Sequence, residues 1–227
     1  MNVSAIIPAL NEERNIEITL RRLHKALLST AEKFEIIVVD DGSTDGTGDV
    51  VGNLMEKYDS LKIIRHNKNE GYGFALRAGI AAAMYEWLFI MDSDNQFDPE
   101  ELSMMTGGAE MENDALIGYR KNRQDSFSRR ISSKVYIILI RYLFGLKFRD
   151  INCAFKLLKR SVVLPLNIKS RYYVINTEIL FKLSMSNHKI KEFPVTHYPR
   201  QHGRSKVALK DILRTLSELR LLKSEKM

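Results

Sequence analysis

Residues 87–96 read Trp-Leu-Phe-Ile-Met-Asp-Ser-Asp-Asn-Gln, five apolar residues followed at once by a polar, acidic loop. A short apolar run bounded by turn residues is typical of a strand that is buried on both faces of a parallel sheet. Ligands of such sheets bind beyond the carboxyl ends of the strands. The decapeptide therefore predicts a core strand and, in its acidic loop, the first place to look for chemistry.

Strands and helices alternate on the N-terminal side of this loop. Apolar runs predict strands at 3–7, 34–39, 61–65 and 87–91, and apolar residues at helical spacing predict helices at 12–28, 45–58 and 74–85. The alternation predicts one α/β domain with a mostly parallel central sheet flanked by helices. The C-terminal half is predicted to be mixed, with a short helix after Pro99, a strand near 115–118, a helix with the apolar run 135–140, a strand at 154–158, a helix at 176–186, an extended segment at 189–198 and an amphipathic helix from 207 to about 223.

The composition is that of a globular protein that attracts anions. The chain has 227 residues, 44% of them apolar, and a formal net charge of +7, which suits an anionic ligand, a nucleic acid or an anionic membrane surface. Cys153 is the single cysteine, so no internal disulfide can form. The run 135–140 falls short of the ~20 apolar residues that span a bilayer. We expect a cytoplasmic protein without a membrane-spanning helix, with most of 135–143 in a buried core helix.

The acidic loop after residue 91 has the composition of a metal site. Alternate residues of an extended segment point the same way, so Asp92, Asp94 and Gln96 can offer oxygen atoms to one side. Such hard ligands suit Mg²⁺ or Mn²⁺ bridging a pyrophosphate. The alternative is a turn rich in Asp and Asn that caps the helix after Pro99.

A second acidic loop, Asp40-Asp41-Gly42-Ser43-Thr44-Asp45-Gly46, follows the strand at 34–39. Ser43 or Asp45 is expected to cap the next helix. Asp41 can also accept a hydrogen bond from a nucleobase ring N–H, and Glu12 on the neighbouring loop can act similarly. These loops would share one edge of the sheet with Asp92.

Glycine placement argues against a dinucleotide-binding oxidoreductase. The glycine fingerprint of that class belongs in the first strand-to-helix turn, where this chain has Pro8-Ala9-Leu10-Asn11-Glu12. Gly71 and Gly73 come after the third predicted strand and are expected to shape the start of a helix near the substrate.

Seven segments together resemble glycosyltransferase family 2, and specifically its dolichyl-phosphate mannosyltransferase-like branch, which uses polyprenyl phosphates. They are PALNE (8–12), VVDDGSTDGT (38–47), GYGFALRAG (71–79), MDSDNQFDP (91–99), GYR (118–120), DINCAFK (150–156) and RQHGRSK (200–206). The resemblance covers roughly 3–206 and implies a single GT-A domain. Its nucleotide-binding half would be 1–98 and its acceptor-binding half 99–206, followed by an amphipathic helix at 207–227.

The resemblance also implies roles for individual residues. Those expected around the nucleotide sugar are Pro8, Leu10, Glu12, Val39, Asp41, Asp92, Ser93, Asp94, Arg120, Arg200 and Lys206. Asp92, Asp94 and Gln96 would bind Mg²⁺ or Mn²⁺. The expected catalytic residues are Asp94 and Arg120, with Arg129 and Ser133 holding the phosphate of a lipid acceptor. Without the resemblance, the basic residues would be read as a solvated face.

The function implied is inverting, metal-dependent transfer of a hexose from a UDP- or GDP-sugar to a polyprenyl (dolichyl or undecaprenyl) phosphate at the cytoplasmic membrane face. A phosphate monoester with a second pKa of ~6 is largely dianionic at neutral pH and needs no general base. The first alternative is a saccharide hydroxyl acceptor, which would need a carboxylate such as Asp150 or Glu178. The second is a non-catalytic module that binds nucleotide sugars or nucleic acid.

The expected partners follow from the same reading. Apolar residues at helical spacing make the last helix amphipathic, which suits core packing, peripheral contact with a membrane or a membrane partner subunit. No nucleic acid partner is expected.

Overall fold

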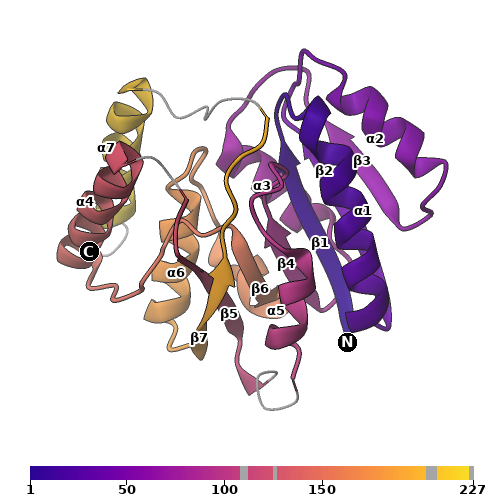
Figure 1. The fold of residues 1–227 in the computed structure, drawn as a ribbon. Helices are drawn as coiled ribbons and strands as arrows, with labels where there is room; N and C mark the ends of the chain where they lie inside the picture. Colours follow the sequence, from indigo (N-terminus) through magenta and orange to yellow (C-terminus); the bar gives the residue numbers. More distant parts are fainter. Residues whose placement is uncertain (108–111, 125–126, 203–208, 225–227) are drawn as a thin grey trace.

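The computed structural model describes residues 1–107, 112–124, 127–202 and 209–224, which form a central sheet with helices on both faces (Figure 1). The strands are β1 (Asn2–Ala9), β2 (Lys33–Asp40), β3 (Leu61–Arg65), β4 (Trp87–Met91), β5 (Ala115–Lys121), β6 (Phe155–Lys159) and β7 (Ile190–Thr196). The helices are α1 (Glu13–Thr30), α2 (Thr47–Met55), α3 (Tyr72–Ala82), α4 (Phe127–Phe144), α5 (Arg160–Val163), α6 (Ile175–Met185) and α7 (Leu209–Ser224), together with the 3-10 helices η1 (Pro99–Met105) and η3 (Leu164–Leu166).

The sheet confirms the predicted α/β architecture. Its strand order is β3-β2-β1-β4-β6-β5-β7. β1 pairs in parallel with β2 and β4, and β2 with β3, as expected for strands separated by helices. β6 runs antiparallel to both β4 and β5, whereas β5 and β7 are parallel, so the second half is mixed. The sheet as a whole is mostly parallel.

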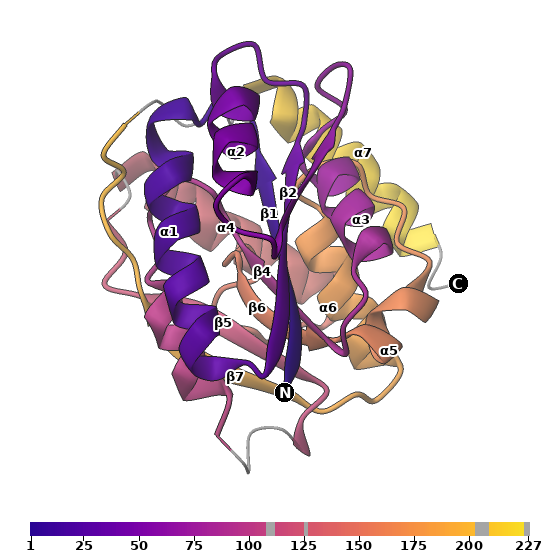
Figure 2. The same cartoon turned by 90° about the vertical axis from the view of Figure 1, so that its right-hand side faces the viewer.

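Two apolar clusters fill the space between the sheet and its helices. One joins the sheet to α1, α2 and η1, and the other joins it to α3, α4, α6 and α7. Figure 2 shows α1 and α2 on one side of the sheet and α3, α6 and α7 on the other. Within α1 the residues at helical spacing, Ile16, Leu20, Leu23 and Leu27, are all buried, which confirms the predicted helix.

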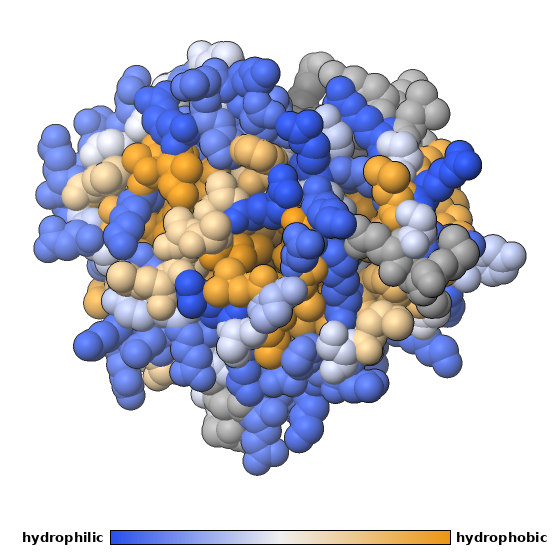
Figure 3. Space-filling model, turned by 180° about the vertical axis from the view of Figure 1, so that it is seen from behind, coloured by the Kyte–Doolittle hydropathy of each residue, from blue (hydrophilic) through white to orange (hydrophobic). Residues whose placement is uncertain are grey.

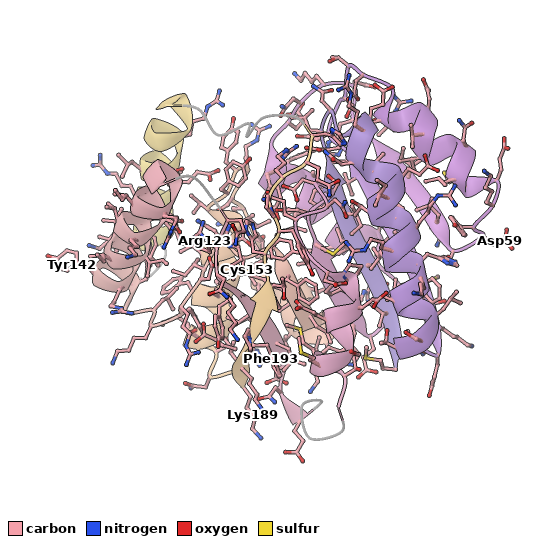
Figure 4. The ribbon with its side chains drawn as sticks, viewed as in Figure 1. Asp59, Arg123, Tyr142, Cys153, Lys189 and Phe193 are labelled. Carbon is pink, nitrogen blue, oxygen red and sulfur yellow. The ribbon has the colours of Figure 1, made fainter. Side chains whose placement is uncertain are left out.

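Helix α4 differs from the sequence-based expectation. Of the stretch 135–143 only Ile140 is fully buried, whereas Val135, Ile138 and Tyr142 are 59%, 66% and 85% exposed. Tyr142 points away from the sheet (Figure 4). The expectation of a core helix therefore holds for one face only, because Tyr136, Leu139 and Leu143 pack on the apolar cluster together with Ile140. No helix in the described part of the chain is long and apolar enough to span a membrane.

Gly79 marks a close contact between α3 and β1, and it provides a stability test. A Cβ added there would lie 2.3 Å from Ile6 Cγ2, whereas a Cβ on Gly52 in α2 would have no atom within 4 Å. Gly79→Ala is expected to lower the free energy of unfolding by about 1–3 kcal/mol, because Ile6 is locked in the central strand. Gly52→Ala should raise it by about 0.5–1 kcal/mol, because alanine loses less backbone entropy in a helix. Denaturant unfolding measures both, and effects of the same sign would contradict this packing.

Candidate active site

The carboxyl ends of β1, β2 and β4 lie at one edge of the sheet, as the sequence predicted. Because β6 is antiparallel to β4 and Phe155 pairs with Met91, the segment 150–154 before β6 reaches the same edge. Arg120 pairs with Val195 near the end of the parallel strands β5 and β7, so the residues that follow both strands also lie there. The topology thus gathers motifs from positions 8 to 202 around one site.

The loop after β4 is held in place by its own backbone and by neighbouring strands. Asn95 adopts a left-handed conformation with φ of 60°, which turns the loop, and Asp94 Oδ1 accepts a hydrogen bond of 3.2 Å from the Gln96 backbone N–H. Ser93 Oγ donates to the Pro8 carbonyl at 2.9 Å. The Ser93 hydroxyl therefore ties β4 to β1, and contact between Ser93 and a nucleotide sugar stays a prediction.

The helix-capping alternative for Asp92 and Asp94 is wrong. Asp98 is the N-cap of η1, and its Oδ1 accepts from the Glu100 N–H at 3.1 Å. In the other acidic loop, Asp45 Oδ1 accepts from the N–H of Thr47, the first residue of α2, at 3.0 Å. Ser43 Oγ instead accepts from the Asn11 N–H at 2.9 Å.

The Asp92, Asp94 and Gln96 side chains fit a hard divalent cation. Burial and the nearby negative charge of Asp94 raise the pKa of Asp92 to about 7, a repulsion that a cation between the two carboxylates would relieve. Gln96 Nε2 donates to the Tyr198 carbonyl at 3.0 Å, which leaves the amide oxygen as the atom to offer a metal. Among the described residues, no three His, Cys, Asp or Glu side chains form a metal-holding cluster. Metal binding by Asp92, Asp94 and the Gln96 amide therefore stays a prediction.

Arg200 places a guanidinium beside this acidic loop. Its Nη1 lies 3.1 Å from Asp94 Oδ2 and its Nη2 lies 2.5 Å from Glu12 Oε1. The Arg200 Nε donates to the His202 carbonyl at 2.7 Å. The positive charge is therefore where the sequence predicted it, although here it contacts carboxylates rather than a phosphate.

Asp41 holds the loop that precedes α3. Its Oδ1 accepts from the Glu70 N–H at 3.0 Å and lies 2.7 Å from His66 Nδ1, and its Oδ2 accepts from the Gly71 N–H at 2.8 Å. The carboxylate already has these protein partners, so contact with a nucleobase stays a prediction. A Cβ on Gly73 would lie 2.6 Å from the Ser170 carbonyl, so this glycine allows α3 to pack on the segment that contains Ser170.

Two further residues expected around the nucleotide, Pro8 and Val39, pair with each other in β1 and β2. Val39 is fully buried in the cluster under α3. Its side chain belongs to the core, which leaves only its backbone for a ligand. Leu10 is partly exposed just beyond β1.

The two carboxylates considered as general bases are both held by cations. Asp150 is 5% exposed and receives a bidentate pair from Arg120, at 2.7 Å from Nε and 2.9 Å from Nη2. Burial alone would raise the pKa of Asp150, but the Arg120 hydrogen bonds and charge bring it below its usual range. Glu178 is 1% exposed and contacts Lys182 Nζ at 2.6 Å, and this contact likewise lowers its pKa against the effect of burial. In this structure both carboxylates are therefore paired with a basic side chain.

The predicted acceptor-phosphate residues lie at the start of α4. Ser133 is partly buried, and its Oγ accepts a hydrogen bond of 2.6 Å from Arg123 Nη1. The side chain of Arg129 and the whole of Lys206 lie outside the described residues, so their predicted roles stay predictions.

A surface pocket adjoins the acidic loops at the start of α1. The side chains and backbone that line it come from Asn11, Glu12, Glu13, Arg14, Asn15, Asp45 and His202. Glu12 is 6% exposed and is tied in place by Asn15 Nδ2, which donates to its Oε2 at 2.7 Å. The pocket places a concave surface next to the residues predicted to surround a nucleotide.

A family model described as Glycosyl transferase family 2 matches residues 4–164, which include β1, β2, β4 and the acidic loops. The chain belongs to glycosyl transferase family 2. This confirms the resemblance inferred from the sequence motifs, although RQHGRSK (200–206) lies beyond the residues that the family model matches.

The curated relatives of this family 2 chain include enzymes named for polyprenyl phosphates. The chain is 31% identical over 222 residues to dodecaprenyl-phosphate galacturonate synthase of Rhizobium johnstonii, with 96% of the chain and 65% of that protein covered. It is 28% identical over 218 residues to undecaprenyl-phosphate 4-deoxy-4-formamido-L-arabinose transferase of Salmonella choleraesuis, with 96% and 66% covered. The chain thus spans slightly less than two thirds of the length of these relatives.

Solved structures confirm the GT-A fold of the family 2 domain. Glucosyl-3-phosphoglycerate synthase from Mycobacterium tuberculosis in complex with Mn²⁺, UDP-glucose and phosphoglyceric acid superposes with a TM-score of 0.73 at 16% identity, covering 98% of this chain and 80% of that one. Mannosyl-3-phosphoglycerate synthase from Rubrobacter xylanophilus gives a TM-score of 0.71 at 18% identity, covering 100% and 75%.

Sequence reasoning missed residues whose signal was present in the family motifs. Arg123 follows the GYR motif by three residues, and Lys156 ends the DINCAFK motif. Lys156 is fully buried, donates to Asn176 Oδ1 at 2.8 Å and to the Cys153 carbonyl, and has its pKa lowered to about 8 by burial. His66, which lies outside the seven motifs, is a partner of Asp41.

Proposed function

We propose that this chain transfers a hexose with inversion from a UDP- or GDP-sugar to a polyprenyl phosphate at the cytoplasmic face of a membrane. The observation that carries the choice of acceptor is the state of Asp150 and Glu178. Both carboxylates are engaged by cations and have lowered pKa values, so neither is suited to deprotonate a saccharide hydroxyl. A phosphate dianion requires no such base. The names of the curated relatives support the same acceptor class.

The donor half of the proposal rests on the edge of the sheet. Asp92, Asp94 and Gln96 would hold Mg²⁺ or Mn²⁺. The positive charge of the metal would neutralise the nucleoside diphosphate that leaves the sugar. Arg200 is close enough to Asp94 to share its charge between that carboxylate and a donor phosphate. Glu12 and Asp41 would face the nucleoside from the ends of β1 and β2. The Mn²⁺ and UDP-glucose bound by the Mycobacterium tuberculosis enzyme support this class of donor.

The membrane part of the proposal rests on α4. Ile131, Val135, Ile138 and Tyr142 are exposed and recur at helical spacing, and the exposed Arg130, Lys134 and Arg141 accompany them. Apolar side chains beside cations suit the interface of an anionic bilayer. Seen from behind, hydrophobic residues also reach the surface on the side where α4 and α7 lie (Figure 3). Because Ser133 is on the same helix, a lipid whose chain lies along α4 could present its phosphate to the site.

One transfer experiment tests the proposal. UDP- and GDP-hexoses are incubated with the protein, with undecaprenyl phosphate in anionic vesicles or a free oligosaccharide as acceptor, and with Mg²⁺, Mn²⁺ or a chelator. We expect a lipid-linked hexose of inverted anomeric configuration from one donor, formed only with a metal ion and vesicle-borne acceptor. Transfer to the oligosaccharide without any lipid-linked product would refute the proposed acceptor.

A further inference from the structure

Arg123 lies just beyond β5 and contacts α4, and the sequence motifs assign it no role. β5 ends at Lys121, and Asn122 adopts a left-handed conformation with φ of 53°. This turn takes the chain out of the sheet, and Arg123 reaches α4, where its Nη1 donates to Ser133 Oγ at 2.6 Å. Figure 4 shows Arg123 on the side of the sheet that faces α4.

The surroundings of Arg123 concentrate positive charge on one point. The charges of Arg120 and Arg123 both contribute to the lowered pKa of Asp150, so both act on this carboxylate. Arg120 makes a bidentate pair with that carboxylate. Arg123 meets the hydroxyl of Ser133 instead, a neutral group that can accept from the guanidinium and donate to an anion at the same time.

A guanidinium and a hydroxyl in contact form a suitable binding site for a phosphate monoester. Arginine presents several N–H donors in a plane, so one can remain on Ser133 while others bind phosphate oxygens. The hydroxyl hydrogen of Ser133 is available for a phosphate oxygen, because its oxygen accepts from Arg123 in this pair. A dianionic phosphate also suits an arginine side chain better than a neutral sugar hydroxyl does.

We infer that Arg123 binds the phosphate of the acceptor and holds Ser133 in position for the same phosphate. The inference rests on the proposed function, since it names a residue that reads the acceptor of that reaction. Arg123 thus acts from the end of β5, and the acceptor phosphate bridges β5 and α4. Its contribution is to acceptor binding, and the donor site at Asp92 and Asp94 does not depend on it.

Equilibrium binding tests this assignment without requiring turnover. Isothermal titration calorimetry with farnesyl phosphate, a short and soluble isoprenyl phosphate, is compared for the wild-type protein, Arg123→Ala, Arg123→Lys and Ser133→Ala. We expect Arg123→Ala to raise the Kd for farnesyl phosphate by about 10- to 100-fold, the effect of losing a charge-assisted hydrogen bond. Arg123→Lys should lose less because it keeps the charge. The Kd for UDP or GDP with Mn²⁺ should change by less than about twofold.

Controls distinguish phosphate binding by Arg123 and Ser133 from general effects of net charge and of folding. Arg149→Ala removes an arginine whose side chain is 63% exposed and stacks on Tyr119, and it should leave the Kd for farnesyl phosphate unchanged. The double variant Arg123→Ala/Ser133→Ala should bind about as weakly as Arg123→Ala alone, because the two residues act on one phosphate. Thermal unfolding checks that each variant is folded. Titration with inorganic phosphate shows whether Arg123 and Ser133 recognise the phosphate group alone. If they do, Arg123→Ala raises the Kd for inorganic phosphate by the same factor as the Kd for farnesyl phosphate.

The outcomes also separate the inference from the proposed function. Wild-type affinity for farnesyl phosphate in both Arg123→Ala and Arg123→Lys would overturn the inference while the proposed function stands. A wild-type protein that binds no farnesyl phosphate and forms no lipid-linked product would overturn both.

Discussion

Replacing Asp94 by Asn is expected to lower kcat for sugar transfer by about 100- to 1,000-fold, the usual cost of losing one group that stabilises developing charge. Asparagine keeps the size of the side chain but removes the charge that a divalent cation requires. Arg200 keeps its contact with Glu12, so the loop should hold its shape. Steady-state kinetics at saturating donor and acceptor measures the effect.

Binding of Mn²⁺ gives Asp94→Asn a readout independent of activity. Mn²⁺ together with a nucleoside diphosphate should raise the Tm of the wild-type protein, because a ligand that binds only the folded state stabilises it. The shift should be small or absent in Asp94→Asn. A variant that keeps the full shift and most of its kcat would show that Asp94 does not bind the metal.

Asp98→Asn is the matched control, because Asp98 lies in the same segment and caps η1. This change retains a capping side chain but weakens the ion pair of 2.9 Å between Arg22 Nη2 and Asp98 Oδ1. We expect a stability loss of no more than about 1 kcal/mol and little change in kcat. Equal losses of kcat in the two variants would point to a general effect of charge in this loop.

Asp150→Ala is expected to lower the free energy of unfolding by about 3–5 kcal/mol, because it leaves the buried guanidinium of Arg120 without its counter-charge. The two side chains are only 10% and 6% exposed and share two hydrogen bonds. Glu17→Ala is the control, because the Glu17–Arg21 pair is about half exposed, and its loss should cost no more than about 0.5 kcal/mol. Urea unfolding at pH 7 measures both, and similar small losses would contradict a tightly held pair.

The pH dependence of the same pair has a definite sign. The folded protein holds the pKa of Asp150 below its ordinary value of 3.8, so the carboxylate binds its proton less readily than in the unfolded chain. The stability that this pair provides is therefore fully present above the ordinary pKa and is lost as the pH falls through the lowered one. The stability difference between wild type and Asp150→Ala should be constant from pH 6 to 8 and should shrink below about pH 4. A difference that shrinks near pH 7 would indicate a carboxyl group with a raised pKa.

The sequence by itself determined most of the strands and the edge of the sheet at which the polar loops lie. Apolar runs such as 87–91 can only be buried, and the polar residues that follow them must emerge at the carboxyl edge of a parallel sheet. This local logic put Asp92, Asp94 and Gln96 in the loop after β4, and their role as metal ligands stays a prediction. It also predicted a helix around the apolar run 135–140, which is α4 in the structure, although it did not predict which face of that helix is buried.

Only the tertiary structure decided what the charged residues do. Whether Asp150 is a base or a counter-ion depends on Arg120, which lies 30 residues away on β5. Because β6 runs antiparallel to β5, the segment before β6 that contains Asp150 lies beside the end of β5. Arg200 meets Asp94 across 106 residues because the chain segments that follow β7 and β4 lie at the same edge of the sheet. Arg123 became a candidate for binding the acceptor only when Asn122 turned it toward Ser133. Charge interactions and hydrogen bonds depend on the distance between two groups in space. The sequence constrains that distance only for residues that are close together in the chain.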